Sequence, residues 1–293
     1  IQPEMLSLLK KRLSRERLDR LGYFETVTVD TPAVPTAPDQ VDVNVTVKER
    51  ATGNIQLGAG YSSSEGVVLT AGLSQQNLFG SGNALSLEVN TSKSNTVFSI
   101  THTDPFLTPE GISRTIELYY RNSDLAELGL SSVGYSTRGA GLIYGLPITE
   151  YDRIFLGLRY EGTTIDLTPA SPPRYIQYVE EFGDSSDALA LTAGWSSDSR
   201  DSLLTPRRGR YQRAFGEFAL PVLDLEYYRL TYQFQQFIPA TSFLTLLFNT
   251  EIGYGNGYGG RPYPFFKNFY VGGIGSVRGF EAASLGPRDI YRD

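Results

Sequence analysis

The chain has 293 residues, with 26 Lys and Arg against 32 Asp and Glu, a formal net charge of −6, one His and no Cys. The absence of Cys excludes disulfide frameworks, thiol nucleophiles and Cys-ligated zinc or iron–sulfur sites. The single His excludes a His-rich metal site, and an acidic balance without a basic block argues against a nucleic-acid-binding protein. The 19 Tyr, 16 Phe and 30 Gly residues instead favour an all-β protein.

The first 50 residues differ in pattern from the rest of the chain. Leucines from Leu6 to Leu21 fall on one helical stripe, which breaks near Ser14, and Gly22 follows where a helix C-cap is expected. Residues 24–29 then alternate as a strand, a Pro-rich segment predicts a loop, and residues 41–47 alternate as a second strand. The sequence therefore predicts a small helix-plus-hairpin module over residues 1–50.

From residue 51 onward the hydrophobic period is two almost everywhere. In the segment 228–235, Leu230, Tyr232 and Phe234 share one face, whereas Arg229, Thr231, Gln233 and Gln235 share the other. About eleven such strands follow one another, several near ten residues long and joined by short turns. No window holds the roughly 18 consecutive apolar residues that a membrane-spanning helix needs, but alternating strands can span a membrane at low mean hydropathy.

Two architectures explain this alternation, a soluble β-sandwich and a membrane β-barrel. Charges lie in mid-strand on the polar faces, as a wet barrel interior allows, and none lies on the apolar faces. Those charges are Glu88, Glu117, Arg159, Arg229 and Glu251. Aromatic residues gather near strand ends, as the interfacial girdles of a barrel would. They include Tyr61, Phe79, Phe106, Tyr151, Trp195, Tyr211 and Tyr254. The pattern favours the barrel.

A resemblance to a known family is carried by the segment 255–280, which ends in Val277-Arg278-Gly279-Phe280 and is followed by Gly286-Pro287. This segment resembles the sixth extracellular loop of the BamA family, the central subunits of the machine that folds proteins into the outer membrane of Gram-negative bacteria. Residues 21–27, 47–50 and 104–108 resemble other stretches of that family in the same order.

The resemblance implies a mainly β protein: an antiparallel transmembrane β-barrel preceded by a partial α/β module. Residues 1–50 would be the C-terminal part of the last POTRA domain, in the periplasm. Residues 51–293 would be the first two-thirds of a sixteen-stranded barrel in the bacterial outer membrane, ending within loop six. We expect the remaining strands to lie beyond Asp293 or in a separate chain.

The resemblance also implies the partners and the two functional sites. The partners would be unfolded outer-membrane proteins, lipoprotein subunits of the assembly complex, the lipid bilayer and lipopolysaccharide, with no nucleic acid, nucleotide, metal or other cofactor. The loop-six motif Val277, Arg278, Gly279 and Phe280 would fold into the barrel, where Arg278 docks on the inner wall. The first barrel strand would be a lateral gate that pairs with an incoming client strand through its backbone, so no side chain would be catalytic. Its residues are Gly53, Asn54, Ile55, Gln56, Leu57, Gly58, Ala59 and Gly60.

Alternative interpretations of the same residues remain open at this point. Gly53, Gly58 and Gly60 would also suit an ordinary weak edge strand. The whole chain could belong to another POTRA-barrel translocator, for autotransporter assembly or two-partner secretion, or to a passive porin. An enzyme would have to depend on His102 with Asp104 and Ser99. Gly255-x-Gly257-x-x-Gly260 matches a dinucleotide-binding pattern by letter, but no helix is predicted after it. The basic residues 10–20 predict a solvated helix face or a contact with partner lipoproteins.

Overall fold

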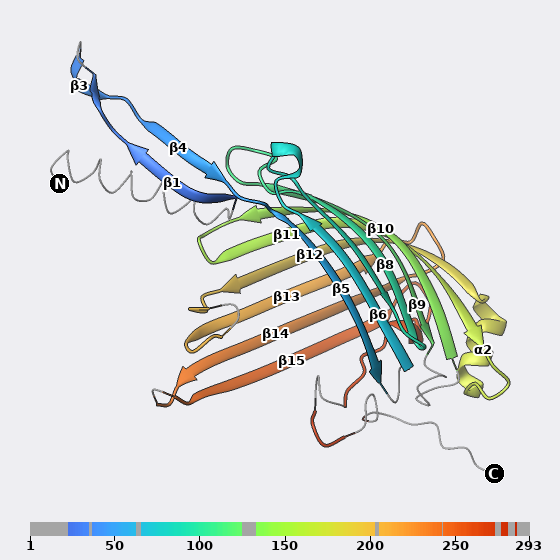
Figure 1. Cartoon of the computed structure of the whole chain (residues 1–293). Helices are drawn as coiled ribbons and strands as arrows, with labels where there is room; N and C mark the ends of the chain where they lie inside the picture. Colours follow the sequence, from blue (N-terminus) through green and yellow to red (C-terminus); the bar gives the residue numbers. More distant parts are fainter. Residues whose placement is uncertain are drawn as a thin grey trace.

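The computed structural model describes residues 23–34, 37–62, 66–124, 133–202, 205–241, 243–272, 277–280 and 285. The helix predicted between Leu6 and Leu21 therefore lies outside the described residues. Within them, the chain forms a short N-terminal hairpin and one large curved sheet (Figure 1).

The large sheet has eleven strands, and each pairs antiparallel with its neighbour in sequence. The strands are β5 (Gly53–Ser62), β6 (Gly66–Gln75), β7 (Ala84–Thr91), β8 (Asn95–Asp104), β9 (Ser113–Asp124), β10 (Val133–Pro147), β11 (Asp152–Leu167), β12 (Ser185–Asp198), β13 (Gly209–Ala219), β14 (Tyr227–Pro239) and β15 (Thr245–Gly257). The prediction of about eleven alternating strands is confirmed. Among the described residues β5 and β15 are the two edges, so this sheet is curved but open rather than a closed barrel.

The antiparallel order divides the connections between the two ends of the sheet. The turns after β6, β8, β10, β12 and β14 lie at the end where β5 begins, and we call this the hairpin end because the N-terminal hairpin leaves from it (Figure 1). The helix α2 (Pro173–Phe182) lies in the connection between β11 and β12 at the opposite end, which we call the α2 end. Among the described residues, no helix is long and apolar enough to cross a membrane.

The N-terminal hairpin is built from β1 (Phe24–Asp30) and β4 (Asn44–Glu49). The strand predicted at residues 24–29 is confirmed, and its residues Val27 and Val29 are buried. The Pro-rich segment between the strands was predicted as a loop, and this is wrong in part. It contains a short two-stranded ladder of β2 (Ala33–Val34) and β3 (Ala37–Val41). Proline is compatible with such a ladder because both strands have a free edge that needs no donor.

The two faces of the large sheet differ as the alternation predicts. Leu57, Leu230 and Ile252 lie on the outward face and are 78%, 52% and 60% exposed. Four of the five predicted mid-strand charges line one cavity on the concave face, and Glu251 lines a second cavity on the same face. A pleated strand turns successive side chains to opposite faces, so a local sequence pattern becomes an apolar outer wall and a polar inner wall.

The hydrophobic core of the described residues sits at the α2 end. It joins the ends of several strands to α2 and to the short 3-10 helix η2 (Phe265–Lys267) that follows β15. The buried residues are Val133, Ile165, Tyr175, Ala188, Ala219, Leu225, Tyr227, Phe265 and Phe266. Helix α2 was not predicted from the sequence. It begins at Pro173, a residue favoured in the first turn, and ends before Gly183, whose φ of 88° suits glycine.

Candidate functional site

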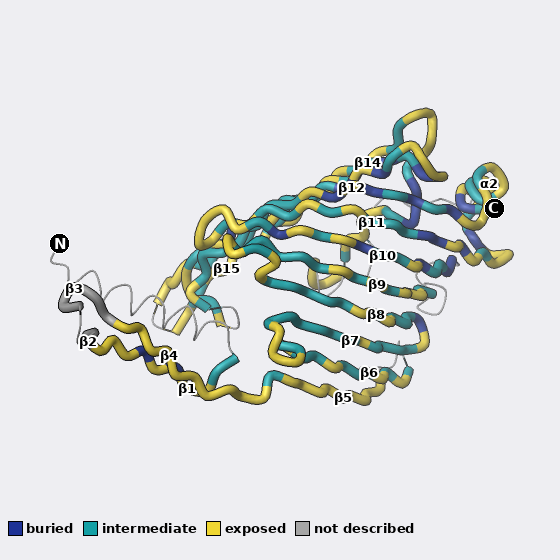
Figure 2. Tube along the Cα trace, turned by 90° about the horizontal axis from the view of Figure 1, so that it is seen from above, coloured by how far each residue is buried: buried dark blue, intermediate teal, exposed yellow. Residues whose placement is uncertain are grey.

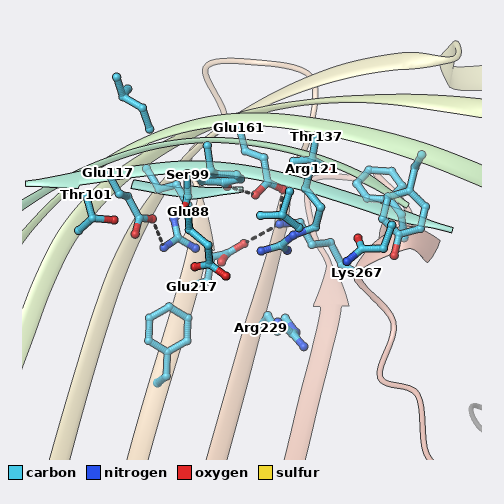
Figure 3. A pocket seen from close by; sticks show the side chains of 18 of the residues that line it. Glu88, Ser99, Thr101, Glu117, Arg121, Thr137, Glu161, Glu217, Arg229 and Lys267 are labelled. Atoms are coloured by element: carbon cyan, nitrogen blue, oxygen red, sulfur yellow. Dashed lines mark hydrogen bonds and ion pairs between the residues drawn. The ribbon is translucent and has the colours of Figure 1, made fainter. Parts of the chain in front are cut away.

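A cluster of charged side chains lies on the concave face of the sheet (Figure 3). We call it the interior charge cluster and define it as Glu117, Arg159, Glu161, Glu217 and Lys267. Strands β9, β11 and β13 supply the first four residues, and η2 supplies Lys267. The cluster lines a cavity of about 720 Å³. The strand residues reach the same cavity because each lies on the inward-facing register of its strand.

Strands β9 and β11 are joined across β10 by two side-chain contacts. Arg159 Nη2 donates to Glu117 Oε1 at 2.6 Å, and the hydroxyl of Tyr119 donates to Glu161 Oε2 at 2.6 Å. Tyr119 and Glu117 are inward neighbours two residues apart on β9, and so are Arg159 and Glu161 on β11. The two contacts therefore form a polar ladder along the inner wall.

Lys267 completes the interior charge cluster by pairing with two carboxylates. Its ammonium group forms an ion pair with Glu161 and lies 3.4 Å from Glu217 Oε1. The hydroxyl of Tyr227 also donates to Glu217. The side chains of Lys267, Glu161 and Glu217 are only 14%, 13% and 5% exposed. Charges so poorly hydrated are tolerated only when they are paired and hydrogen-bonded, so these three residues depend on one another.

Aromatic contacts bring Lys267 to the inner wall. The ring of Phe265 stacks on Tyr175 of α2 with 4.1 Å between ring centroids. The hydroxyl of Tyr263 donates to the carbonyl oxygen of Lys267 at 2.9 Å, and Arg229 lies 4.4 Å from the ring centroid of Phe269. Residues 263–269 are thus held against the concave face along their whole length, and we call them the inner strap.

Glycines on β15 make room for the inner strap. A Cβ atom at Gly255 would lie 2.7 Å from the ring of Tyr263, and one at Gly253 would collide with Phe269. Real Cβ atoms do not approach other atoms this closely, so the strap packs directly on the strand backbone. Gly255 and Gly257 are therefore strand residues, and Gly260, with φ of 83°, lies in the turn that follows. This arrangement accounts for the Gly-x-Gly-x-x-Gly spacing without a dinucleotide.

The predicted gate residues Gly53 to Gly60 form most of β5. This strand pairs with β6 along its whole length, from Gly53 opposite Gln75 to Ser62 opposite Gly66, and has no other partner strand among the described residues. Figure 2 shows β5 as exposed almost throughout. Its free edge presents unpaired backbone N–H and C=O groups, which is the geometry that strand addition requires.

The loop-six motif Val277–Phe280 forms a turn in which all four residues are exposed. Gly279 has φ of 90°, a conformation that suits glycine. Among the described residues, no ion pair joins Arg278 to the inner face, where Lys267 is the strap residue that supplies the cation. The docking of Arg278 on the inner wall stays a prediction.

The catalytic alternative conflicts with the pleat of β8. Ser99 lines the cavity of the interior charge cluster, whereas His102 shares the outward face with Phe98 and Ile100. Residues three apart on a strand point to opposite faces, so Ser99 and His102 cannot act together. Across the part of the chain that the structure describes, no group of three or more His, Cys, Asp or Glu residues could hold a metal ion.

Three members of the interior charge cluster, Glu161, Glu217 and Lys267, are absent from the mid-strand charges predicted from the sequence. Glu217 lies in a strand with the inward period of the other charges, so the alternation could have identified it. Lys267 lies in an irregular segment and gives no periodic signal of its own. A lysine between aromatic residues, ten residues after a strand that ends in Gly-x-Gly-x-Gly, is the local signal that the sequence offers.

Comparison with known proteins assigns the chain to a family. Residues 77–293 match the model of the Omp85 superfamily domain, and the chain belongs to that superfamily. It is similar to the outer membrane protein assembly factor BamA of Neisseria meningitidis serogroup B, with 38% identity over 290 residues. That match covers 95% of this chain but 36% of the relative, so the chain spans about a third of the relative's length.

Solved structures agree with this assignment. The crystal structure of BamA from Haemophilus ducreyi lacking POTRA domains 1–3 superposes with a TM-score of 0.79 and 29% identity. The superposition covers 94% of this chain and 55% of that chain. CdiB from Acinetobacter baumannii superposes with a TM-score of 0.55 at 15% identity, over 90% of this chain and 49% of that chain. The likeness to CdiB is one of fold alone.

Proposed function

We propose that this chain is part of an assembly factor that folds and inserts outer-membrane proteins through a lateral gate. The observation that carries the proposal is the long strand β5, which stands at a free edge of the sheet in a member of the Omp85 superfamily similar to BamA. Such an edge can add a client strand by backbone hydrogen bonding, and client side chains then reach lipid directly.

The protein belongs in the bacterial outer membrane, as its BamA homologues do. We propose that further strands close the described sheet into a barrel, because an open sheet in hydrocarbon would leave two rows of backbone groups without partners. The N-terminal hairpin would be the end of a POTRA domain in the periplasm. The hairpin end of the sheet would then face the periplasm, and the α2 end would face the outside.

The gate mechanism requires weak pairing between β5 and the strand that closes the barrel beside it. We call this pairing the seam, and its opening must cost little free energy. Gly58 and Gly60 put no side chains on the inward face of β5, and a Cβ atom at Gly60 would have no neighbour within 4 Å. Glycine in a strand interior lowers the stability of its pairing. Free energy for insertion would come from client strand pairing and from burial of apolar side chains in lipid, so neither nucleotide nor a catalytic side chain is needed.

The inner strap would position loop six for this activity. Its ion pairs with Glu161 and Glu217 fix the chain to the inner wall only ten residues before Val277. We propose that this anchor directs Arg278 toward the barrel interior when the closing strands are present. Clients, lipoprotein subunits and lipopolysaccharide would then meet a barrel with a fixed interior and a movable seam.

Cysteine cross-linking tests the gate, because the natural chain has no Cys. The full-length protein carrying Gln56→Cys in β5, with any Cys outside residues 1–293 replaced by Ser, would be reconstituted with an outer-membrane client bearing a Cys in its last strand. We expect a disulfide to the client that forms during insertion and disappears when insertion is complete. The matched control is Thr137→Cys in β10, at the centre of the sheet. Equal cross-linking at both positions, or none at residue 56, would contradict a gate at β5.

A passive porin is the alternative that the interior of the sheet disfavours. The inner strap and the interior charge cluster occupy the concave face that a diffusion pore would leave open. A porin predicts steady ion conductance of the purified protein in planar bilayers and no loss of other barrel proteins when it is depleted. The assembly factor predicts little ion conductance of the purified protein and a loss of other barrel proteins when it is depleted.

A further inference from the structure

The turn between β6 and β7 stands apart from the other turns at the hairpin end. We call residues 77–83, Asn-Leu-Phe-Gly-Ser-Gly-Asn, the β6–β7 turn. Asn77 and Phe79 have φ of 55° and 51°, and they are the two non-glycine residues with positive φ among the described residues. A bulky residue rarely adopts this conformation unless its surroundings impose it.

Hydrogen bonds within the β6–β7 turn impose this conformation. The N–H of Leu78 donates to the carbonyl of Asn83 at 2.7 Å, and the N–H of Gly82 donates to Oδ1 of Asn77 at 2.8 Å. The hydroxyl of Ser81 donates to the carbonyl of Leu78 at 2.6 Å and accepts from the N–H of Asn83. The N–H groups of residues 80 and 81 donate within the turn as well. Most of its backbone donors therefore need no water.

The rigid turn presents one aromatic ring to its surroundings. Phe79 is 98% exposed, the highest value among the exposed large hydrophobic side chains of the described residues. No residue from Gln76 to Asn83 carries a charge, and none does from residue 240 to 244 between β14 and β15, whereas the three turns between these two carry Glu110, Glu150 and Asp201. An uncharged turn with internally satisfied donors and a projecting aromatic ring is suited to the boundary between headgroups and acyl chains.

The surface around the turn continues into the outward apolar face of the sheet. Leu73 on β6 and Leu87 on β7 are opposite each other on that face, and Leu85 follows Leu87 toward the turn. The same turn also contacts the N-terminal hairpin, because the hydroxyl of Tyr23 donates to the carbonyl of Gly82 at 3.1 Å. Thr52, at the junction before β5, exchanges hydrogen bonds with Gln76.

We propose that the β6–β7 turn is a membrane anchor whose Phe79 ring inserts into the interfacial zone of the bilayer leaflet at the hairpin end. The anchor holds the carbonyl of Gly82 at a fixed depth, and Tyr23 binds to that carbonyl. The N-terminal hairpin is thereby tied to the membrane surface next to the start of β5. This inference rests on the outer-membrane location given under the proposed function.

Tryptophan fluorescence tests the anchor, because the chain has one Trp, Trp195, on the outward face of β12. The full-length protein carrying Phe79→Trp and Trp195→Phe, with any Trp outside residues 1–293 replaced by Phe, would be reconstituted in phosphatidylcholine vesicles, with and without bromine on the acyl chains. We expect its emission to shift to shorter wavelength than that of the urea-unfolded protein. We also expect quenching by brominated lipid and protection from aqueous iodide. Gel mobility before and after heating would establish that the variant is folded.

Two controls separate the possible outcomes. The same protein with Trp195 as its one Trp reports whether the sheet is in the bilayer at all. Ser202→Trp in the Trp195→Phe background places the reporter in the charged turn between β12 and β13 and should remain accessible to iodide. If Trp195 is quenched by brominated lipid while residue 79 behaves like residue 202, the anchor is refuted and the membrane location stands. If Trp195 is not quenched either, the membrane location itself is refuted.

Discussion

Replacing Lys267 by Met removes the ammonium group that Glu161 and Glu217 share. Met keeps most of the aliphatic length of the side chain, so the change deletes a charge from the inner strap without opening a large cavity. Tyr119 and Tyr227 still donate to the two carboxylates, but two negative charges then face each other without the ammonium group that pairs with both.

The burial of the three side chains determines the size of the effect. Removing one partner from a buried, hydrogen-bonded ion pair costs about 3–5 kcal/mol, because an uncompensated charge is left in a poorly hydrated site. We therefore expect Lys267→Met to destabilise the docked inner strap by about 3–5 kcal/mol. The triple variant Lys267→Met, Glu161→Gln, Glu217→Gln removes all three charges, and we expect it to recover most of the loss.

Hydrogen exchange measured by mass spectrometry on the full-length protein in lipid vesicles would check this expectation. Peptides that cover residues 263–269 should exchange faster in Lys267→Met and return toward the natural rate in the triple variant. The matched control is Lys48→Met. It removes an ion pair to Glu25 of 2.6 Å whose side chains are 69% and 56% exposed. That exposed pair should contribute less than about 1 kcal/mol.

Two results would refute the reasoning. Unchanged exchange in Lys267→Met would show that the aromatic contacts alone hold the inner strap. Equal destabilisation by Lys267→Met and Lys48→Met would show that burial does not govern the energy of these pairs.

Three further predictions follow from the geometry. Gly255→Val should displace Tyr263 and lower the free energy of unfolding by about 1–3 kcal/mol through overpacking. Gly194→Val meets only ordinary contacts and should lower it less. Urea unfolding in vesicles measures both changes. Gly60→Ala should strengthen strand pairing at the seam by about 0.4–1 kcal/mol and slow client insertion about two- to fivefold, and Gly194→Ala should leave the insertion rate unchanged. Hydrogen bonds from the N–H groups of Arg207 and Arg208 hold the pKa of Asp201 below its ordinary value. A depressed folded-state pKa gives stability that is present above the unfolded value of about 4 and is lost as pH falls through the folded value. Protection of the Arg207 and Arg208 amides should therefore decrease below about pH 4 in the natural protein and should not depend on pH there in Asp201→Asn.

The period-two pattern predicted the strands and their faces well, and the reason is local. A strand turns alternate side chains to opposite sides whatever its neighbours are, so residues 228–235 already identify their outward and inward members. The edge position of β5 could also be read from the order of the chain, since consecutive strands in such proteins pair with their neighbours. Helix α2 was missed although Tyr175, Ile176, Tyr178, Val179 and Phe182 have helical spacing, because one ten-residue helix stands inside a long run of period-two strands.

The sequence by itself determined the family, the number of strands in the sheet and the chemistry of its two walls. Only the tertiary structure decided which charges meet. Lys267 and Glu217 are 50 residues apart in the sequence. They become neighbours because the sheet curves and the segment after β15 lies over its concave face. The pairing of a buried charge depends on that curvature and on the absence of side chains at Gly253 and Gly255. Contacts of this kind are set by the three-dimensional path of the backbone, which a one-dimensional period does not contain.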